Sequence, residues 1–122
     1  MQNSMRFSKD HIWIIPNGDT ATIGITDYAQ ESLGSIMFLN LPEVGETLET
    51  GKRFGDIESI KTVTDLISPV SGSVIKVNEE LLDEPDLINE KPYECWFLEI
   101  KVTSISEDLM DEKSYVTKIG NS

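Results

Sequence analysis

Residues 11–25 read HIWIIPNGDTATIGI, two runs rich in β-branched and aromatic side chains on either side of Pro16-Asn17-Gly18-Asp19. An Asn-Gly pair between such runs is a strong local signal for a β-hairpin, because both residues tolerate the backbone angles of a tight turn. The sequence therefore predicts a first hairpin with strands at 11–15 and 20–25.

Further β-rich runs follow along the chain, separated by proline and glycine. A turn is expected at residues 68–72, Ser-Pro-Val-Ser-Gly, because proline fixes one backbone angle and glycine relieves the steric limits on another. The remaining strands are expected at 35–41, 53–57, 62–64, 73–77 and 96–102.

A short helix is expected at 28–33, between the first hairpin and the next strand. Either Thr26 or Asp27 can serve as its N-cap, since both side chains offer an oxygen to the free backbone N–H groups of the first turn. Gly34 suits the left-handed position that ends a helix.

The C-terminal half is expected to contain two more helical segments. One spans 78–84 and stops before Pro85, after which 86–92 should be loop. Ser106 is a candidate cap for a C-terminal helical segment. Three apolar side chains of that segment are expected to face the body: Leu109, Met110 and Tyr115.

Many short strands, small helices at the edges and no long βαβ pattern predict a mainly β fold. We expect a flattened β-barrel or sandwich with short peripheral helices and a C-terminal helix. The length of 122 residues fits one domain. Residues 7–122 are expected to form it, and residues 1–6 to be a flexible leader or a remnant of cloning.

The charge balance narrows the choice of partners. With 22 acidic against 10 basic residues, the formal charge of −12 repels nucleic-acid backbones and anionic lipids, so neither nucleic acid nor membrane is expected as a partner. No apolar run is long enough to span a bilayer. The single cysteine, Cys95, has no partner for an internal disulfide. A reducing compartment and a cytoplasmic location are therefore expected.

Side chains of the usual catalytic kinds are few, and the sequence contains no metal-ligand spacing. His11, beside Ile12 and Trp13, is expected to be structural because no partner for a general base is visible. Cys95 is expected to be a packed thiol, since no nearby cation lowers its pKa. The acidic stretch at 79–84 lacks the alternating pattern of a calcium loop.

The stretch 55–65, GDIESIKTVTD, is expected to form a second hairpin with Lys61 near its tip. The Lys61 amine stands on a flexible four-carbon stem, and an amide bond to an acid would remove its charge and extend its reach. By itself, however, a lysine on an exposed hairpin is ordinarily no more than a solvated surface group.

Several stretches match one family pattern. The most specific is ATIGITDYAQESLG at 21–34. Shorter matches are LPEVG (41–45), ESIK (58–61), SPVSG (68–72), VNE (77–79), LIN (87–89) and PY (92–93). Over residues 7–115 the chain resembles the H-proteins of the glycine cleavage system, which are lipoyl carriers with a biotinyl/lipoyl-domain-like fold.

The resemblance implies that lipoate is attached covalently to Lys61 and that the protein is a non-catalytic carrier. It implies delivery of an aminomethyl intermediate from the PLP-dependent glycine decarboxylase (P-protein) to the aminomethyltransferase (T-protein). Dihydrolipoyl dehydrogenase (L-protein) then reoxidises the dithiol. A lipoate ligase or lipoyl transferase would attach the group. Glu58 and Asp65 flank Lys61 in the family pattern and are candidates for recognition by that enzyme, although hairpin solubility explains them equally well.

Two departures from the pattern bear on function. The family usually has His-Glu-Trp where this chain has His11-Ile12-Trp13, so a carboxylate near the loaded arm is missing. Positions 10 and 12 of one strand would share a face, so Asp10, together with Asp65, is expected to line the cleft for the aminomethyl arm. In addition, only two residues separate Tyr93 from Trp96 where the family commonly has three.

Alternative functions follow from the same features. One is an H-like carrier devoted to lipoate relay or redox signalling. Another is an unmodified acidic module that binds a basic partner. Biotinylation is disfavoured, because biotin carriers typically have methionines beside the lysine, whereas Ile60 and Thr62 flank Lys61.

Overall fold

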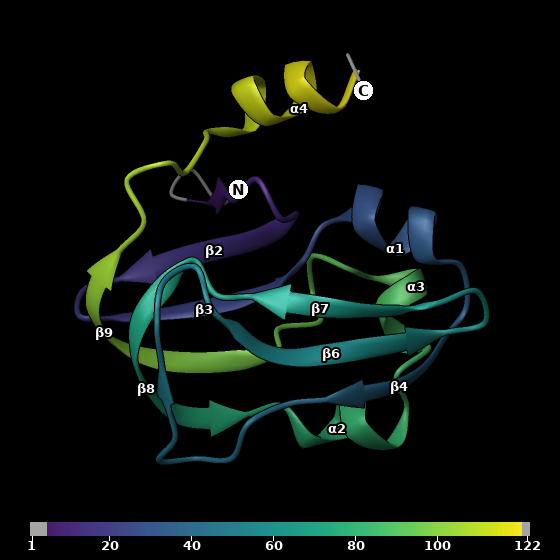
Figure 1. Ribbon diagram of the computed structural model, residues 1–122, viewed down its shortest axis with the longest axis horizontal. Coiled ribbons are helices and arrows are strands. Elements are labelled where there is room, and N and C mark those ends of the chain that lie inside the picture. The colour runs from purple at the N-terminus through teal and green to yellow at the C-terminus, as the bar shows by residue number, and fades with distance from the viewer. Residues whose placement is uncertain (1–4, 121–122) are drawn as a thin grey trace.

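The computed structural model describes residues 5–120, and its chain folds into two antiparallel sheets with four helices among the described residues (Figure 1). The elements in chain order are β1 (Arg6–Phe7), β2 (Ile12–Asn17), β3 (Thr20–Ile25), α1 (Asp27–Leu33), β4 (Ile36–Asn40), β5 (Thr47–Leu48), β6 (Arg53–Ser59), β7 (Val63–Ile67), β8 (Val70–Val77), α2 (Glu79–Asp83), α3 (Leu87–Glu90), β9 (Leu98–Ile105) and α4 (Glu112–Gly120).

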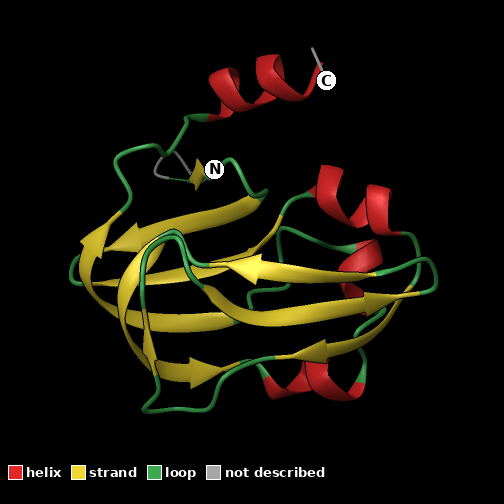
Figure 2. Ribbon diagram, in the orientation of Figure 1, coloured by secondary structure: helices red, strands yellow, loops and turns green. Residues whose placement is uncertain are grey.

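The two sheets pack into a flattened sandwich. The larger has the order β1-β2-β3-β9-β8-β5 and the smaller the order β4-β6-β7, with every pair antiparallel. Both sheets contribute fully buried side chains to one core, including Ile14, Ile23 and Ile100 from the larger and Ile57 from the smaller. Three short helices gather at one end of the sandwich, while α4 lies apart beyond β1 (Figure 2). The expected mainly β class is confirmed.

The first hairpin forms as the sequence predicts. β2 and β3 pair from Ile12 opposite Ile25 to Asn17 opposite Thr20, which leaves Gly18 and Asp19 as the tip. β2 runs through Pro16, beyond the expected end at residue 15. Proline is tolerated there because β1 pairs only with Trp13 and Ile14, so no ladder hydrogen bond is lost at Pro16.

α1 begins and ends where the sequence indicates. Of the two candidate caps, Thr26 is the one used, since its Oγ1 accepts a hydrogen bond from the Ala29 N–H at 3.2 Å. Gly34 follows the last helical residue with φ of +77°, which glycine adopts without steric cost. The position of this glycine matters for the functional site described below.

Two of the predicted boundaries in the second half are wrong. Only Ser68-Pro69 separates β7 from β8, so the expected turn at 68–72 ends early and Gly72 lies inside a strand. Glycine is needed at position 72 because a Cβ there would lie 2.0 Å from the Lys101 carbonyl oxygen of β9. The strand expected at 96–102 instead spans Leu98–Ile105.

The expected loop at 86–92 is also wrong, because it contains the one-turn helix α3. Pro85 does not prevent this helix, since proline is compatible with the residues that open a helix and excluded only from its interior. Ile88 is fully buried, so packing on the core holds a helix that the local sequence does not favour.

Ser106 is not the cap of the C-terminal helix. Its Oγ accepts a hydrogen bond from the Asp108 N–H in a turn, whereas Asp111 Oδ1 accepts one from the Ser114 N–H at the start of α4. Between them Met110 forms a β-bridge with Phe7. Leu109 and Met110 therefore pack on the body as expected, but from this bridge and not from a helix.

The N-terminal prediction falls partly outside the described residues. Of the leader or cloning remnant expected at 1–6, residues 1–4 lie outside them. Arg6 is described and belongs to β1, where it pairs with Ile14. β1 and α4 enclose a second apolar cluster, in which the Phe7 and Tyr115 rings stack with centroids 4.7 Å apart.

Candidate functional site

The second hairpin, β6–β7, ends in a tight turn that presents Lys61. Glu58 is the last β6 residue paired with β7, and Ser59 donates its backbone N–H to the Thr62 carbonyl at 2.8 Å. Ser59 Oγ also accepts hydrogen bonds from the backbone N–H groups of Lys61 and Thr62, each at 3.2 Å. The serine hydroxyl thus closes the turn, as in other short serine-stabilised loops. Ile60 and Lys61 are left at the tip.

The Lys61 side chain is exposed and forms no ion pair within residues 5–120. Two other lysines on the body do, Lys76 with Glu99 at 3.8 Å and Lys101 with Asp19 at 3.3 Å. The Lys61 ammonium therefore has solvent access on a short, stiff turn, which is the arrangement required for an enzyme to reach the amine.

The tip rests on the segment that follows α1. The Ile60 N–H donates to the Ser35 carbonyl at 3.0 Å, and Ile36 pairs with Ser59. A Cβ on Gly34 would lie 3.5 Å from Lys61 Cε and 3.6 Å from Ile60 Cγ2, so the lysine stem runs over this glycine. We call residues 34–36 the hairpin seat.

The outer face of the smaller sheet adjoins the tip. Phe38, Glu58 and Val63 form one row across β4, β6 and β7, because Glu58 pairs with both of the others. Phe38 is 60% exposed and Val63 59% exposed, which is unusual for large apolar side chains on a sheet. This row lies beside Lys61 and exposes two apolar side chains around one carboxylate.

The two sequence-predicted recognition residues differ in their surroundings. Asp65 accepts a hydrogen bond from Arg53 Nε at 2.9 Å, and Arg53 also pairs with Asp56. These hydrogen bonds, first that to Asp65 and then that to Asp56, raise the pKa of Arg53. Among the described residues the Glu58 carboxylate has no hydrogen bond or ion pair. Glu58 is thus an unpaired carboxylate on the hairpin that carries Lys61.

The shared-face argument for Asp10 is wrong. β2 begins at Ile12, and Asp10 lies in a turn where Ser8 Oγ accepts hydrogen bonds from the N–H groups of both Asp10 and Ile12. His11, with φ of +65°, interrupts the strand direction between them. Ile12 is 1% exposed, so its side chain is part of the core.

His11 and Cys95 occupy structural positions, as the sequence indicates. His11 Nδ1 lies 2.8 Å from the Tyr115 hydroxyl, which also lies 2.7 Å from Thr26 Oγ1. The pKa of His11 is lowered, chiefly by burial and then by the charge of Lys118. Cys95 is buried, and burial raises the pKa of its thiol. A raised pKa disfavours the nucleophilic thiolate.

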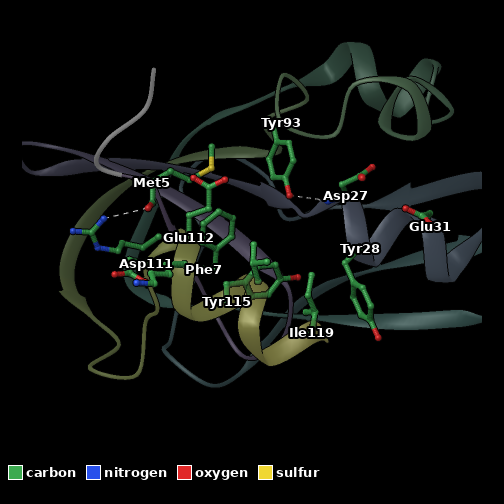
Figure 3. Close-up of a pocket in the computed structure, with 13 residues that line it drawn as sticks. Met5, Phe7, Asp27, Tyr28, Glu31, Tyr93, Asp111, Glu112, Tyr115 and Ile119 are labelled. Carbon is green, nitrogen blue, oxygen red and sulfur yellow. Dashed lines mark hydrogen bonds between the residues drawn. The ribbon is translucent and has the colours of Figure 1, made fainter. Parts of the chain in front are cut away.

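A separate cavity lies elsewhere on the molecule. It has a volume of about 630 Å³ and is bounded by β1, α1, Tyr93 and α4, with Tyr28, Tyr93 and Tyr115 among its lining residues (Figure 3). The Tyr93 hydroxyl accepts a hydrogen bond from the Asp27 N–H at its edge. No residue of the β6–β7 hairpin lines this cavity. The lysine site is consequently a projecting surface and not a pocket.

Other kinds of site find no support in the part of the chain that the structure describes. Over residues 5–120, no group of three or more His, Cys, Asp or Glu side chains is placed to hold a metal ion. In the same range no helix is long and apolar enough to cross a membrane.

A flattened β-sandwich that presents an exposed, unpaired lysine on a tight hairpin has the architecture of a carrier domain of the lipoyl or biotinyl type. Comparison with known proteins gives the family. Residues 5–122 match the family model described as glycine cleavage H-protein. The chain belongs to the glycine cleavage H-protein family, which is a family of lipoyl carriers.

Individual relatives agree with this assignment. The glycine cleavage system H protein of Staphylococcus carnosus is 47% identical over 119 residues, covering 95% of this chain and 94% of the relative. That of Clostridioides difficile is 50% identical over 114 residues, covering 91% of each. The crystal structure of a glycine cleavage system H protein from Mycobacterium marinum matches with a TM-score of 0.91 and 37% identity, covering 98% of this chain and 99% of that one.

Two features of the site were not predicted from the sequence. Phe38 is an apolar residue in a β run, and nothing in the local pattern separates it from its buried neighbour Leu39. Asn89 was placed in a loop, yet its side chain contacts the hairpin seat. The match of LIN at 87–89 to the family pattern was the available signal for Asn89, but it carried no role.

Proposed function

We propose that Lys61 bears lipoate in amide linkage and that the protein carries the aminomethyl intermediate of glycine cleavage. In this proposal the P-protein loads the carrier, the T-protein unloads it, and the L-protein restores the disulfide. A lipoate ligase or lipoyl transferase attaches the group. The observation that supports it most directly is the free, exposed Lys61 on a turn closed by Ser59.

The residues present fit a covalently attached arm. The Lys61 amine has no competing ion pair among the described residues, and acylation would leave no partner unsatisfied. Bound lipoate supplies a disulfide that can accept a group and be restored by thiol–disulfide exchange. The chain's own contribution is geometric. The turn and the hairpin seat hold the point at which the arm is attached. When an enzyme docks there, the reactive end of the arm stays close to it, which raises the effective concentration of that end.

Lys61→Arg tests the attachment site. Intact mass is measured after incubation with a lipoate ligase, ATP and lipoate. The native chain should gain one lipoyl adduct and Lys61→Arg none, since the guanidinium is a far poorer acyl acceptor. Lys76→Arg is the matched control and should be labelled normally. An adduct on Lys61→Arg, or its mapping to Lys52 or Lys76, would refute the assignment.

We also propose that the attaching enzyme recognises Glu58 and Asp65, with Glu58 the stronger contact. Glu58 is unpaired and lies between exposed Phe38 and Val63, whereas Asp65 is engaged by Arg53. Glu58→Gln should therefore lower the lipoylation rate by about five- to tenfold, the loss expected for one charge-assisted hydrogen bond, and Asp65→Asn by less. Equal effects of the two variants would contradict this ranking.

Asp10 and Asp65 are further proposed as the carboxylates that face a cationic amine carried on the arm. Asp65 shares the hairpin with Lys61, and Asp10 would act from the 8–11 turn. A buried ammonium without an anion is costly, so one of them should be needed when the arm is sheltered. If the double variant Asp10→Asn/Asp65→Asn retains the carried amine as long as the native protein does, neither carboxylate has this role.

We propose as a second candidate a lipoate relay that does not take part in glycine turnover, because Ile12 is a core residue and offers no carboxylate to a loaded arm. The two are separated by offering the lipoylated protein to the P-protein with glycine and measuring release of carbon dioxide. Release supports the glycine cleavage role. A lipoylated protein that releases none supports the relay, and a protein that never gains an adduct supports the unmodified acidic module.

A further inference from the structure

Asn89 makes three side-chain hydrogen bonds that converge on the end of α1 and the start of β4. Its Oδ1 accepts from the Ile36 N–H at 3.0 Å. Its Nδ2 donates to the Gly34 carbonyl at 2.8 Å and to Gln30 Oε1 at 2.9 Å. The amide uses its acceptor and both of its donor hydrogens.

The hydrogen-bond partners determine which way the Asn89 amide is oriented and why an asparagine is required at this position. A backbone N–H can only donate and a backbone carbonyl can only accept, so the oxygen must face Ile36 and the nitrogen must face Gly34. Aspartate lacks the two donors, and serine is too short to bridge both groups. Only a carboxamide of this length completes the arrangement.

These bonds hold the hairpin seat on both sides of Ser35. The Gly34 carbonyl precedes Ser35 and the Ile36 N–H follows it, and the Ser35 carbonyl is the group that accepts the Ile60 N–H. The clamp therefore fixes the direction of the carbonyl that holds the tip. Asn89 is itself held in place by its neighbour Ile88, which is fully buried in the core.

We propose that Asn89 is a positioning residue for the lysine hairpin, acting through the seat at 34–36 and not by contact with Lys61. The inference rests on the proposed role of Lys61. Asn89 connects the core to the tip through the junction of α1 and β4, and the direction in which the amine projects therefore depends in part on it. Loss of the clamp should spread the tip over several orientations and lower the fraction presented to an enzyme.

The first test is amide hydrogen exchange by NMR on the unmodified full chain. In Asn89→Ala the Ile60 amide should exchange about fivefold or more faster relative to core amides such as Ile14 and Ile100, as the weakening of one hydrogen bond predicts. Asn78→Ala is the matched control. Asn78 is also partly buried and donates to the Trp96 carbonyl at 2.9 Å, away from the seat. The Asn78→Ala variant should leave the exchange rate of the Ile60 amide, relative to the core amides, unchanged.

Two further variants grade the effect. Gln30→Ala removes one partner of Asn89 but keeps both bonds to the seat, so its effect on Ile60 should be much smaller. Asn89→Asp keeps the shape and the acceptor but loses the donors, so its effect should approach that of Asn89→Ala. A uniform rise in exchange at Ile60 and the core amides alike would show a merely structural role and overturn the proposal.

The second readout is the rate of lipoylation followed by intact mass. Asn89→Ala should lower kcat/KM for the chain as substrate by about fivefold, while Asn78→Ala stays within twofold of the native value. Unchanged Ile60 exchange and unchanged labelling in Asn89→Ala would overturn the inference. If the native chain gains no adduct, the proposed function fails, but the exchange experiment still decides whether Asn89 holds the tip.

Discussion

The hairpins β2–β3 and β6–β7 both end in tight turns, yet their strands have opposite surroundings. Along β2, Ile12, Trp13 and Ile14 are all buried, and β3 is covered on its other edge by β9. Along β7, residues 63–65 are all exposed, and no strand within residues 5–120 pairs with its outer edge. The first hairpin lies in the core along most of its length, whereas the second reaches the core through Ile57 and Leu66 and projects from it only at its tip. Similar local geometry therefore serves stability in one place and presentation of Lys61 in the other.

The two hairpins should differ most in how much stability is lost when an apolar side chain is truncated to alanine. Ile14→Ala should lower the free energy of unfolding by about 3 kcal/mol, because a fully buried isoleucine leaves a cavity. Ile60→Ala, at a residue 70% exposed, should change it by less than about 0.5 kcal/mol. Denaturant unfolding of both variants measures the difference. Comparable losses would mean that the tip of the second hairpin packs as tightly as the core.

A smaller effect is expected where the chain enters the first hairpin. The Tyr115 hydroxyl joins His11, just before β2, to Thr26, the cap of α1. Tyr115→Phe keeps the ring stacked on Phe7 but removes both hydrogen bonds, and should cost about 1–2 kcal/mol. Thermal unfolding at matched pH provides the measurement, and an unchanged midpoint would show that the hydroxyl contributes nothing net.

The pH dependence of stability should contain a contribution from His11. Its pKa is lowered in the folded state, mainly by burial, so below the unfolded value of about 6.5 the unfolded chain binds a proton that the folded chain resists. Stability is thus complete above that value and falls as the pH drops toward the folded pKa. His11→Asn, which tolerates the positive φ, should show a shallower decrease between about pH 6.5 and 5. An equal slope in both proteins would exclude this role.

The smallest effect is expected from the modification itself. Lys61 is exposed and unpaired in the described structure, so acylation removes no stabilising contact. Lipoylated and unmodified protein should differ in thermal midpoint by less than about 2 °C. Calorimetry on the two forms tests this. A large increase on lipoylation would show that the arm packs into the body, and the contrast between the two hairpins would then need revision.

Local sequence rules predicted those elements in which one short stretch contains the whole cause. Asn17-Gly18 between two β runs gave the first hairpin, and Thr26 with Gly34 gave both ends of α1. The same rules failed at α3 and at Gly72. α3 forms because Ile88 is buried, and Gly72 is needed because Lys101 of β9 passes close to it. In both cases the residues that pack against the element lie far from it in the sequence.

The candidate site divides in the same way. The sequence alone determined the mainly β class, the hairpin at 55–65, Lys61 as its distinctive residue and the likeness to the H-proteins. Only the tertiary structure decided that Asp65 is engaged by Arg53 while Glu58 is free, that Asp10 lies in a turn, and that Asn89 clamps the seat beneath the tip. Hydrogen bonds and burial depend on which strands become neighbours. That is set by the packing of the two sheets and not by any single stretch of the chain.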